Sequence, residues 1–266
     1  MAVLTGRRLG DAVLVASAGA LACATAMAPP GPGSPVRAAI MAVLAAGLVL
    51  AAVVRRSQSA VRATAVVTTV FVIFSGGAWL EVPPAVVTVV VGVAPLLLLA
   101  LLGHDQPGPA LPWLRVGWLD PHVGALAAAT TLVAVAALAL FAVLVRPEVS
   151  SYLMTLRSIP VWLAVLGVIG FALVNPVWEE VLYRGVLQHE LSRTVGPWPA
   201  VAIQAALFGL SHLYGFPSGW LGVAMATVWG FGLGVIRLRT GGIIVPYLVH
   251  VVANLTVGML AIVLLY

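Results

Sequence analysis

The segment NPVWEEVLYRGVLQHE, residues 175–190, places charged side chains inside a chain that is otherwise almost continuously apolar. Glu179 and Glu180 are adjacent, and Arg184 follows Glu180 by four residues. Residues four apart share one face of a helix, and an acid on the N-terminal side of a base is the favourable order for an ion pair. Adjacent residues point about 100° apart, so Glu179 projects elsewhere. We therefore expect Arg184 to neutralise Glu180 as structural support and Glu179 to remain free for chemistry.

Two residues predict where the helix that carries this segment begins. Proline is favoured in the first turn of a helix, where its missing N–H costs nothing, and asparagine is a good cap just before that turn. Asn175 and Pro176 therefore predict a helix start, with both glutamates in the first turns, where the helix dipole favours negative charge.

Two histidines and an asparagine stand in later apolar runs. His212 follows Phe208 by four residues in LFGLSHLYG, and His250 precedes Asn254 by four in YLVHVVANL, so each pair shares a helix face. A lone intramembrane histidine is as often bonded to a backbone carbonyl as it is catalytic. Together with Glu179, however, these residues supply a carboxylate, two imidazoles and an amide, which suit the hydrolysis of an amide bond by water.

A metal site is the nearest chemical alternative. Glu179, His212 and His250 are residue types that bind zinc and can leave an open position for water. The chain lacks the HExxH spacing of helical zinc proteases, although separate helices could still assemble such a site. We expect no cofactor, and we keep zinc on these three residues as the alternative.

Composition defines the elements that must position these residues. Of the 266 residues, 62% are hydrophobic and 8% are charged, and the mean hydropathy is +1.13, so the sequence predicts an all-α, polytopic membrane helix bundle. Apolar windows long enough to cross the bilayer fall at 11–28, 38–54, 63–80, 84–102 and 123–145, and shorter or interrupted ones at 161–174, 198–214, 218–236 and 243–265. We expect eight to nine transmembrane helices. Ionisable groups within such spans cost about 2.5 to 3.5 kcal/mol on insertion scales, so those in the second half of the chain are candidates for function.

The distribution of arginine predicts the orientation of the chain. All thirteen basic residues are arginines, and they stand mostly in short loops, which does not suggest a nucleic-acid partner. With nine spans and a cytoplasmic N-terminus, ten arginines fall on the cytoplasmic side and only Arg37, Arg146 and Arg157 fall outside. The short loops favour an integral protein of a prokaryotic plasma membrane.

The predicted spans conflict with the predicted site in one respect. If 161–174 and 198–214 both cross the membrane simply, Glu179 and His212 lie at opposite ends of neighbouring spans and cannot meet. Either the segment 177–195 returns into the membrane as part of a helix, or the span with His212 is offset. Irregular backbone is tolerated at membrane depth where it lines a wet cavity.

Three motifs occur in order: two glutamates and an arginine (EExxxR), then FxxxH, then HxxxN. Over residues 160–260 this order resembles the CPBP (Abi) family of intramembrane proteases, which includes the CAAX prenyl endopeptidases and bacteriocin-processing or immunity proteins. The resemblance implies that Glu179 is the general base, that His212 helps to hold and polarise the water, and that His250 and Asn254 form the oxyanion hole. The supporting residues are then Glu180, Arg184 and Phe208.

The resemblance also implies a division of the chain and a class of partner. We expect accessory helices in 1–150 and the catalytic membrane core in 151–266. The expected function is cleavage of a peptide bond near the C-terminus of a membrane-associated or lipidated peptide. The alternatives are a transporter, in which the same residues form a proton relay, and an immunity-type scaffold, in which glycines such as Gly230 and Gly234 only pack helices.

Overall fold

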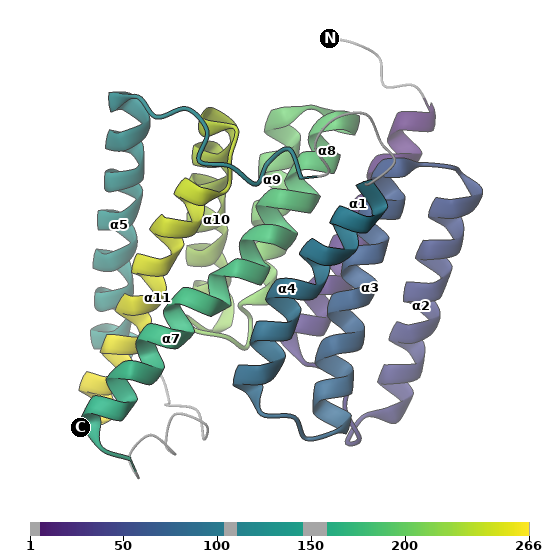
Figure 1. The fold of residues 1–266 in the computed structure, drawn as a ribbon. Coiled ribbons are helices and arrows are strands. Elements are labelled where there is room, and N and C mark those ends of the chain that lie inside the picture. The colour runs from purple at the N-terminus through teal and green to yellow at the C-terminus, as the bar shows by residue number, and fades with distance from the viewer. Residues whose placement is uncertain (1–5, 104–110, 146–158, 266) are drawn as a thin grey trace.

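The computed structural model describes residues 6–103, 111–145 and 159–265, and this part of the chain is entirely helical (Figure 1). The helices are α1 (Gly6–Met27), α2 (Pro35–Val54), α3 (Gln58–Trp79), α4 (Pro84–Gly103), α5 (Pro121–Val145), α7 (Val161–Glu179), the π-helical η2 (Glu180–Leu187), α8 (Gln188–Val195), α9 (Pro197–Ser211), α10 (Gly219–Thr240) and α11 (Ile244–Leu265). Within the described ranges, eight segments are long and apolar enough to span a membrane. The predicted fold class is confirmed.

The helices of the first half lie where the apolar windows predict them. Proline begins α2, α4 and α5, which is the first-turn position at which it costs least. At the start of α3, the Ser57 hydroxyl accepts a hydrogen bond from the Ala60 amide at 3.3 Å and so caps the helix.

The second half departs from the prediction because α7, η2 and α8 form one continuous helix from Val161 to Val195. Pro176 lies inside this helix and Asn175 does not cap it, so the predicted helix start at Pro176 was wrong. Neighbouring helices stabilise an interior proline in a membrane protein, and that tertiary context overrides the local preference. The helix has 35 residues, or about 50 Å at the α-helical rise, and it carries the glutamates into the middle of the bundle.

A tight turn at Gly196 brings the glutamates and His212, which were expected at opposite ends of neighbouring spans, to a similar depth in the bundle. Gly196 has a φ of 92°, which favours glycine, and Pro197 then starts α9 in the reverse direction. Glu180 and His212 are each sixteen residues from Gly196, so the two antiparallel arms bring them to a similar level. Neither alternative holds as stated: the segment 177–195 is helical, but it continues α7 without turning back, and α9 begins at Pro197, close to the expected start of its span.

A second hairpin places the last motif at the same level. α10 ends at Thr240, and Gly241, with a φ of 73°, reverses the chain into α11. Gly230 and His250 lie about ten residues on either side of this turn, and both face η2 through the contacts described below. Figure 1 shows α5, α10 and α11 on one side of the bundle, α1 to α4 on the other, and α7 to α9 between them.

The arginines gather at one end of the bundle, the end from which the described chain starts. There, Arg55 donates to the Arg7 carbonyl at 3.1 Å and Arg115 donates to the Gly241 carbonyl at 3.1 Å. By the order of helices and turns, this arginine-rich end carries Arg7, Arg8, Arg55, Arg56, Arg62, Arg115, Arg193, Arg237 and Arg239. Arg37, at the start of α2, stands at the opposite end, where the C-terminus also lies (Figure 1). Arg146 and Arg157 fall outside the described residues.

Candidate active site

The predicted ion pair between Glu180 and Arg184 is present in η2. Arg184 Nη1 donates to Glu180 Oε1 at 2.9 Å, and the two side chains are 0% and 1% exposed. A buried pair of this kind persists only where further hydrogen bonds offset the cost of desolvation. The segment that carries the pair is π-helical, and single π-helical turns inside α-helices are frequent at functional sites.

The guanidinium of Arg184 makes two more contacts across the bundle. Its Nη2 donates to the Gly230 carbonyl of α10 at 3.3 Å, and its Cζ lies 4.4 Å from the centre of the Phe208 ring. An arginine over an aromatic face is attracted by the ring's quadrupole. Arg184 therefore ties η2 to both α9 and α10, which agrees with a supporting role.

His250 of α11 lies between the two glutamates. Its Nδ1 is 2.8 Å from Glu180 Oε1, and its Nε2 is 3.3 Å from Glu179 Oε2. Because the carboxylate oxygen of Glu180 accepts, Nδ1 carries the hydrogen, and this bond fixes the orientation of the ring. Glu180 thus does more than neutralise Arg184: it also holds His250.

Glu179 is oriented by its own helix. Asn175 Nδ2 donates to Glu179 Oε1 at 3.0 Å, and Trp178 Nε1 donates to Asn175 Oδ1 at 3.0 Å. Neither Asn175 nor Trp178 was among the predicted site residues. The four-residue spacing from Asn175 to Glu179 could have indicated the contact, but the adjacent proline favoured reading Asn175 as a cap.

His212 follows the last residue of α9. Its Nδ1 lies 2.9 Å from the Phe208 carbonyl, and since a carbonyl only accepts, Nδ1 is the donor. In the neutral ring Nε2 is then left as an acceptor. The rings of His212 and His250 both lie against the ring of Phe208.

Phe208 is the apolar centre of the site. Its ring stacks edge-on against Tyr183 at 5.1 Å between centroids, and lies 4.6 Å from the ring of His212 and 5.9 Å from that of His250. Because Phe208 is buried and touches Arg184 as well, it joins all three motifs.

Asn254 lies one turn after His250 on α11. Its Nδ2 is buried and has no hydrogen-bond partner among the described residues. An unmatched buried donor is costly in a folded protein and calls for an explanation. The amide therefore has an N–H available for a bound molecule.

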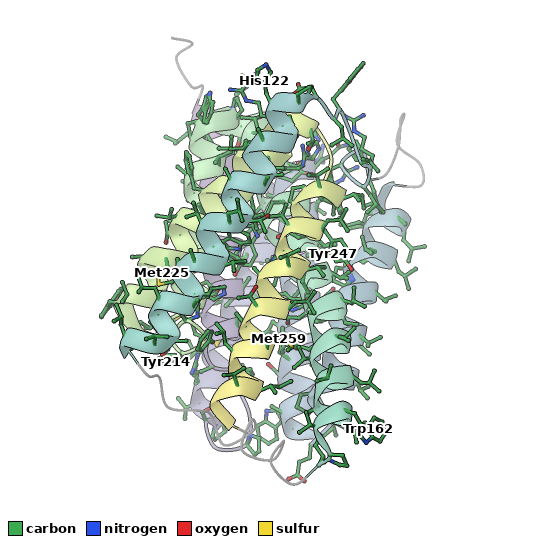
Figure 2. The ribbon with its side chains drawn as sticks, turned by 90° about the vertical axis from the view of Figure 1, so that its left-hand side faces the viewer. His122, Trp162, Tyr214, Met225, Tyr247 and Met259 are labelled. Atoms are coloured by element: carbon green, nitrogen blue, oxygen red, sulfur yellow. The ribbon has the colours of Figure 1, made fainter. Side chains whose placement is uncertain are left out.

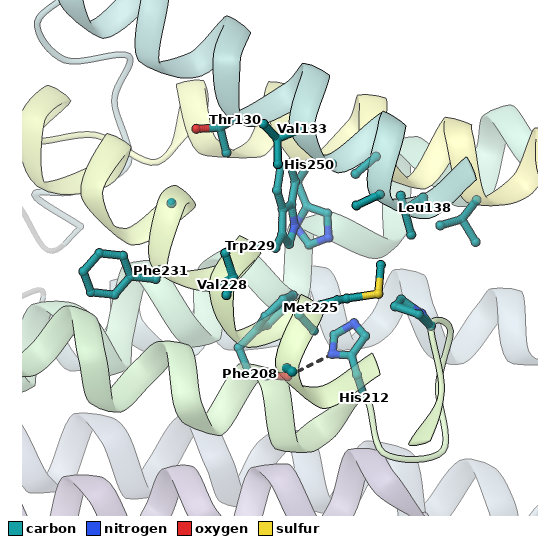
Figure 3. A pocket seen from close by; sticks show the side chains of 18 of the residues that line it. Thr130, Val133, Leu138, Phe208, His212, Met225, Val228, Trp229, Phe231 and His250 are labelled. Carbon is teal, nitrogen blue, oxygen red and sulfur yellow. Dashed lines mark hydrogen bonds between the residues drawn. The ribbon is translucent and has the colours of Figure 1, made fainter. Parts of the chain in front are cut away.

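A cavity of about 640 Å³ adjoins this polar cluster (Figure 3). His212, His250 and Asn254 line one part of it, and Figure 3 shows both imidazoles directed into the same space. The other lining residues are mostly aliphatic or aromatic and come from α5, the loop after α9, α10 and α11; they include Val133, Leu138, Phe216, Met225, Trp229 and Val257. The sequence motifs do not predict this cavity, because α5 carries none of them.

The described ranges contain no assembled set of ligands for the metal ion considered as an alternative. No group of three or more His, Cys, Asp and Glu side chains there is arranged to hold a metal ion. Glu179 Oε2 and His250 Nε2 are 3.3 Å apart, and His212 keeps Nε2 free because its Nδ1 donates to a backbone carbonyl. Zinc on these three residues stays the alternative, and we derive no chemical step through it.

The fold and the site together define a helical membrane protein whose buried glutamates, histidines and asparagine adjoin an apolar cavity. Residues 160–256 match the family model described as type II CAAX prenyl endopeptidase Rce1-like, so this segment belongs to that family, which is a family of peptidases. The match spans α7 to the first half of α11 and contains all seven residues of the three motifs. The comparisons with curated proteins and with solved structures gave no match. The predicted resemblance is confirmed for this segment.

Proposed function

We propose that this protein is an intramembrane endopeptidase in which Glu179 activates a water molecule for attack on a peptide bond. The observation that carries the proposal is that His212, His250 and the unmatched Asn254 amide line one apolar cavity, and that Glu179 Oε2 lies 3.3 Å from His250 Nε2. General base, water-holding imidazole and oxyanion donors are the parts that such hydrolysis needs.

Each residue has a role that its contacts support. Asn175 holds Oε1 of Glu179, and Oε2, which faces His250 Nε2 at 3.3 Å, takes the proton from water. His212, with Nδ1 donating to Phe208, offers Nε2 as an acceptor that orients the same water. Asn254 Nδ2 supplies an N–H group for the oxyanion, and His250 supplies a second from Nε2 in the form of the ring that carries hydrogen on both nitrogens. Glu180 and Arg184 keep His250 in place.

The cavity defines the part of the substrate that binds. An almost wholly apolar wall next to the polar cluster suits a peptide with large apolar side chains or an attached lipid. We propose that a membrane-associated peptide places its scissile bond at the polar residues and its apolar group in the cavity. Since α5 lines the cavity, the binding site extends beyond the core of 151–266, and we propose a supporting role for the other helices of 1–150.

Purified protein in detergent, incubated with a quenched-fluorescence peptide library, tests this function. The wild type should cleave a subset of peptides rich in apolar residues, Glu179→Gln should cleave none while keeping the same thermal unfolding midpoint, and a strong chelator should have no effect. Loss of cleavage with chelator and recovery with zinc would instead assign Glu179, His212 and His250 as metal ligands. Equal cleavage by wild type and Glu179→Gln would contradict the proposal.

A further inference from the structure

Three residues outside the catalytic motifs form a series of contacts that ends at Glu179. Asn175 Nδ2 donates to Glu179 Oε1 at 3.0 Å, and Trp178 Nε1 donates to Asn175 Oδ1 at 3.0 Å. The Trp178 ring in turn meets the Phe74 ring edge-on, with 5.4 Å between the centroids and 75° between the planes. The series therefore runs from α3, in the first half of the chain, to the glutamate proposed as the general base.

The two neighbours of Asn175 require the same orientation of its amide. An indole N–H can only donate, so Trp178 must meet the oxygen of the amide. An ionised carboxylate can only accept, so Glu179 must meet the nitrogen. Because a flipped amide would break both bonds, the bond from Trp178 stabilises the orientation in which Asn175 donates to Glu179.

This arrangement gives the two oxygens of Glu179 different surroundings. Oε1 accepts from Asn175, whereas Oε2 faces His250 Nε2 at 3.3 Å. The last torsion of a glutamate side chain is broad, so a hydrogen bond is needed to hold the carboxylate in one rotation. The bond from Asn175 fixes that rotation and keeps Oε2 on the side of the histidine.

Packing against the first half of the chain holds Trp178 in place. Trp178 is 7% exposed and belongs to the main apolar core, against which Phe74 also packs. An edge-on pair of aromatic rings is attractive beyond the area that it buries. One residue before Trp178, Val177 lies against Gly92 of α4, where an added Cβ would be 3.4 Å from Val177 Cγ1. The turn that precedes Glu179 therefore contacts both α3 and α4.

We propose that Asn175, Trp178 and Phe74 are positioning residues that select Oε2 of Glu179 as the atom that takes the proton. Each acts through the next, and only Glu179 meets the water. The proton transfer rests on the proposed peptidase function, but the series of contacts does not. Because the family match begins at residue 160, the proposal also gives α3 a part in positioning the base, although α3 lies outside the matched segment.

Steady-state kinetics of peptide cleavage test the role of the indole N–H. Trp178→Phe keeps an aromatic ring against Phe74 and removes the donor, so kcat should fall about tenfold with KM unchanged. Trp162→Phe is the matched control, because Trp162 lies on the same helix but is 65% exposed and points away from the bundle (Figure 2). Equal kcat values for the two variants would overturn the proposal.

A double-variant cycle tests whether the residues act in series. Asn175→Leu removes both hydrogen bonds at similar volume, so adding Trp178→Phe to it should lower kcat no further. Losses that multiply would show two independent effects and would overturn the series. All kinetics are measured well below the unfolding midpoint of every variant, so that a loss of stability alone leaves kcat unchanged.

Fluorine NMR of protein labelled with fluorotryptophan tests the contacts without a substrate. The chain has eight tryptophans, and Trp178→Phe identifies the resonance that belongs to Trp178. Phe74→Leu and Asn175→Leu change its two neighbours in the series, so both should shift that resonance. Gly170→Ala should leave it in place, since a Cβ at that position meets nothing within 4 Å. A resonance that stays unchanged in Asn175→Leu or in Phe74→Leu would overturn the series.

The two measurements separate this proposal from the proposed function. If the wild type cleaves library peptides and Trp178→Phe cleaves them equally well, the peptidase function stands and the positioning role fails. If the resonance shifts as expected but the wild type cleaves no library peptide, the contacts stand, while the peptidase function fails and the positioning role fails with it.

Discussion

At the scale of single residues, the two adjacent glutamates have different surroundings. Glu180 accepts from Arg184 and from His250, whereas Glu179 is held by Asn175 and faces His250 with its other oxygen. Spacing alone predicted the ion pair, because residues four apart must face each other on a helix. It did not predict that Glu180 also holds His250, since that contact joins residues 70 positions apart and depends on how the helices pack.

Glu180→Gln should lower both stability and activity. The change leaves the buried Arg184 without its counter-charge, which typically costs about 3 to 5 kcal/mol, and it weakens the bond that orients His250. Thermal unfolding and peptide cleavage measure the two effects. The double variant Glu180→Gln/Arg184→Met should recover much of the stability and little of the activity. Recovery of both would show that Glu180 has no role in holding His250.

Asn254→Leu should separate catalysis from stability. Because Nδ2 of Asn254 is buried without a partner, its removal should leave the unfolding midpoint unchanged or slightly higher. Loss of an oxyanion donor should lower kcat by about 10² to 10³ with little change in KM. Steady-state kinetics on a cleaved library peptide provide the readout, and a change confined to KM would place Asn254 in substrate binding instead.

At the scale of elements, the register of two hairpins assembles the site. Apolar windows predicted the positions of the crossing helices well, because length and hydropathy decide which segments enter a bilayer. They failed between residues 175 and 195, where polar side chains interrupt the apolar run although the helix continues. The information that keeps this segment in the bundle is its set of buried partners, such as the carbonyls of Gly230 and Gly234, which local sequence does not reveal.

Gly230→Ala should disturb the site through α10. An added Cβ at this position would lie 2.9 Å from the Phe208 ring and 3.3 Å from Arg184 Nη2. We expect a lower unfolding midpoint together with reduced cleavage. Gly170→Ala is the matched control, since a Cβ there meets nothing within 4 Å and alanine favours a helix by up to about 1 kcal/mol. If Gly230→Ala and Gly170→Ala have the same unfolding midpoint and the same cleavage activity, Gly230 has no role beyond ordinary helix packing.

At the scale of the whole molecule, the cavity is built jointly by the two halves of the chain. The family match begins at residue 160, but α5 supplies part of the cavity wall. Composition and arginine distribution predicted the bundle and the gathering of charge at one end. No pattern in the sequence predicted the cavity, because its α5 wall is an apolar helix surface that resembles any other lipid-facing one until the packing is known.

Ala134→Trp should narrow the cavity without touching the polar cluster. The added indole would occupy space now open beside α5, so KM for peptides with bulky apolar side chains should rise by at least tenfold, with a smaller effect on peptides with small ones. Leu140→Trp is the control, because Leu140 belongs to the same helix but is exposed and does not line the cavity. An equal rise for both peptide classes, or for both variants, would argue against the cavity as the site that binds the substrate.

Single-turnover cleavage in ¹⁸O-labelled water tests the central claim, that Glu179 activates water and does not attack the peptide itself. Mass spectrometry of a cleaved peptide and of the protein should find one ¹⁸O atom in the new C-terminal carboxylate and none in Glu179, and Glu179→Gln should form no product. Label in the Glu179 side chain would show a covalent intermediate, and product formed at the wild-type rate by Glu179→Gln would remove this residue from the chemistry.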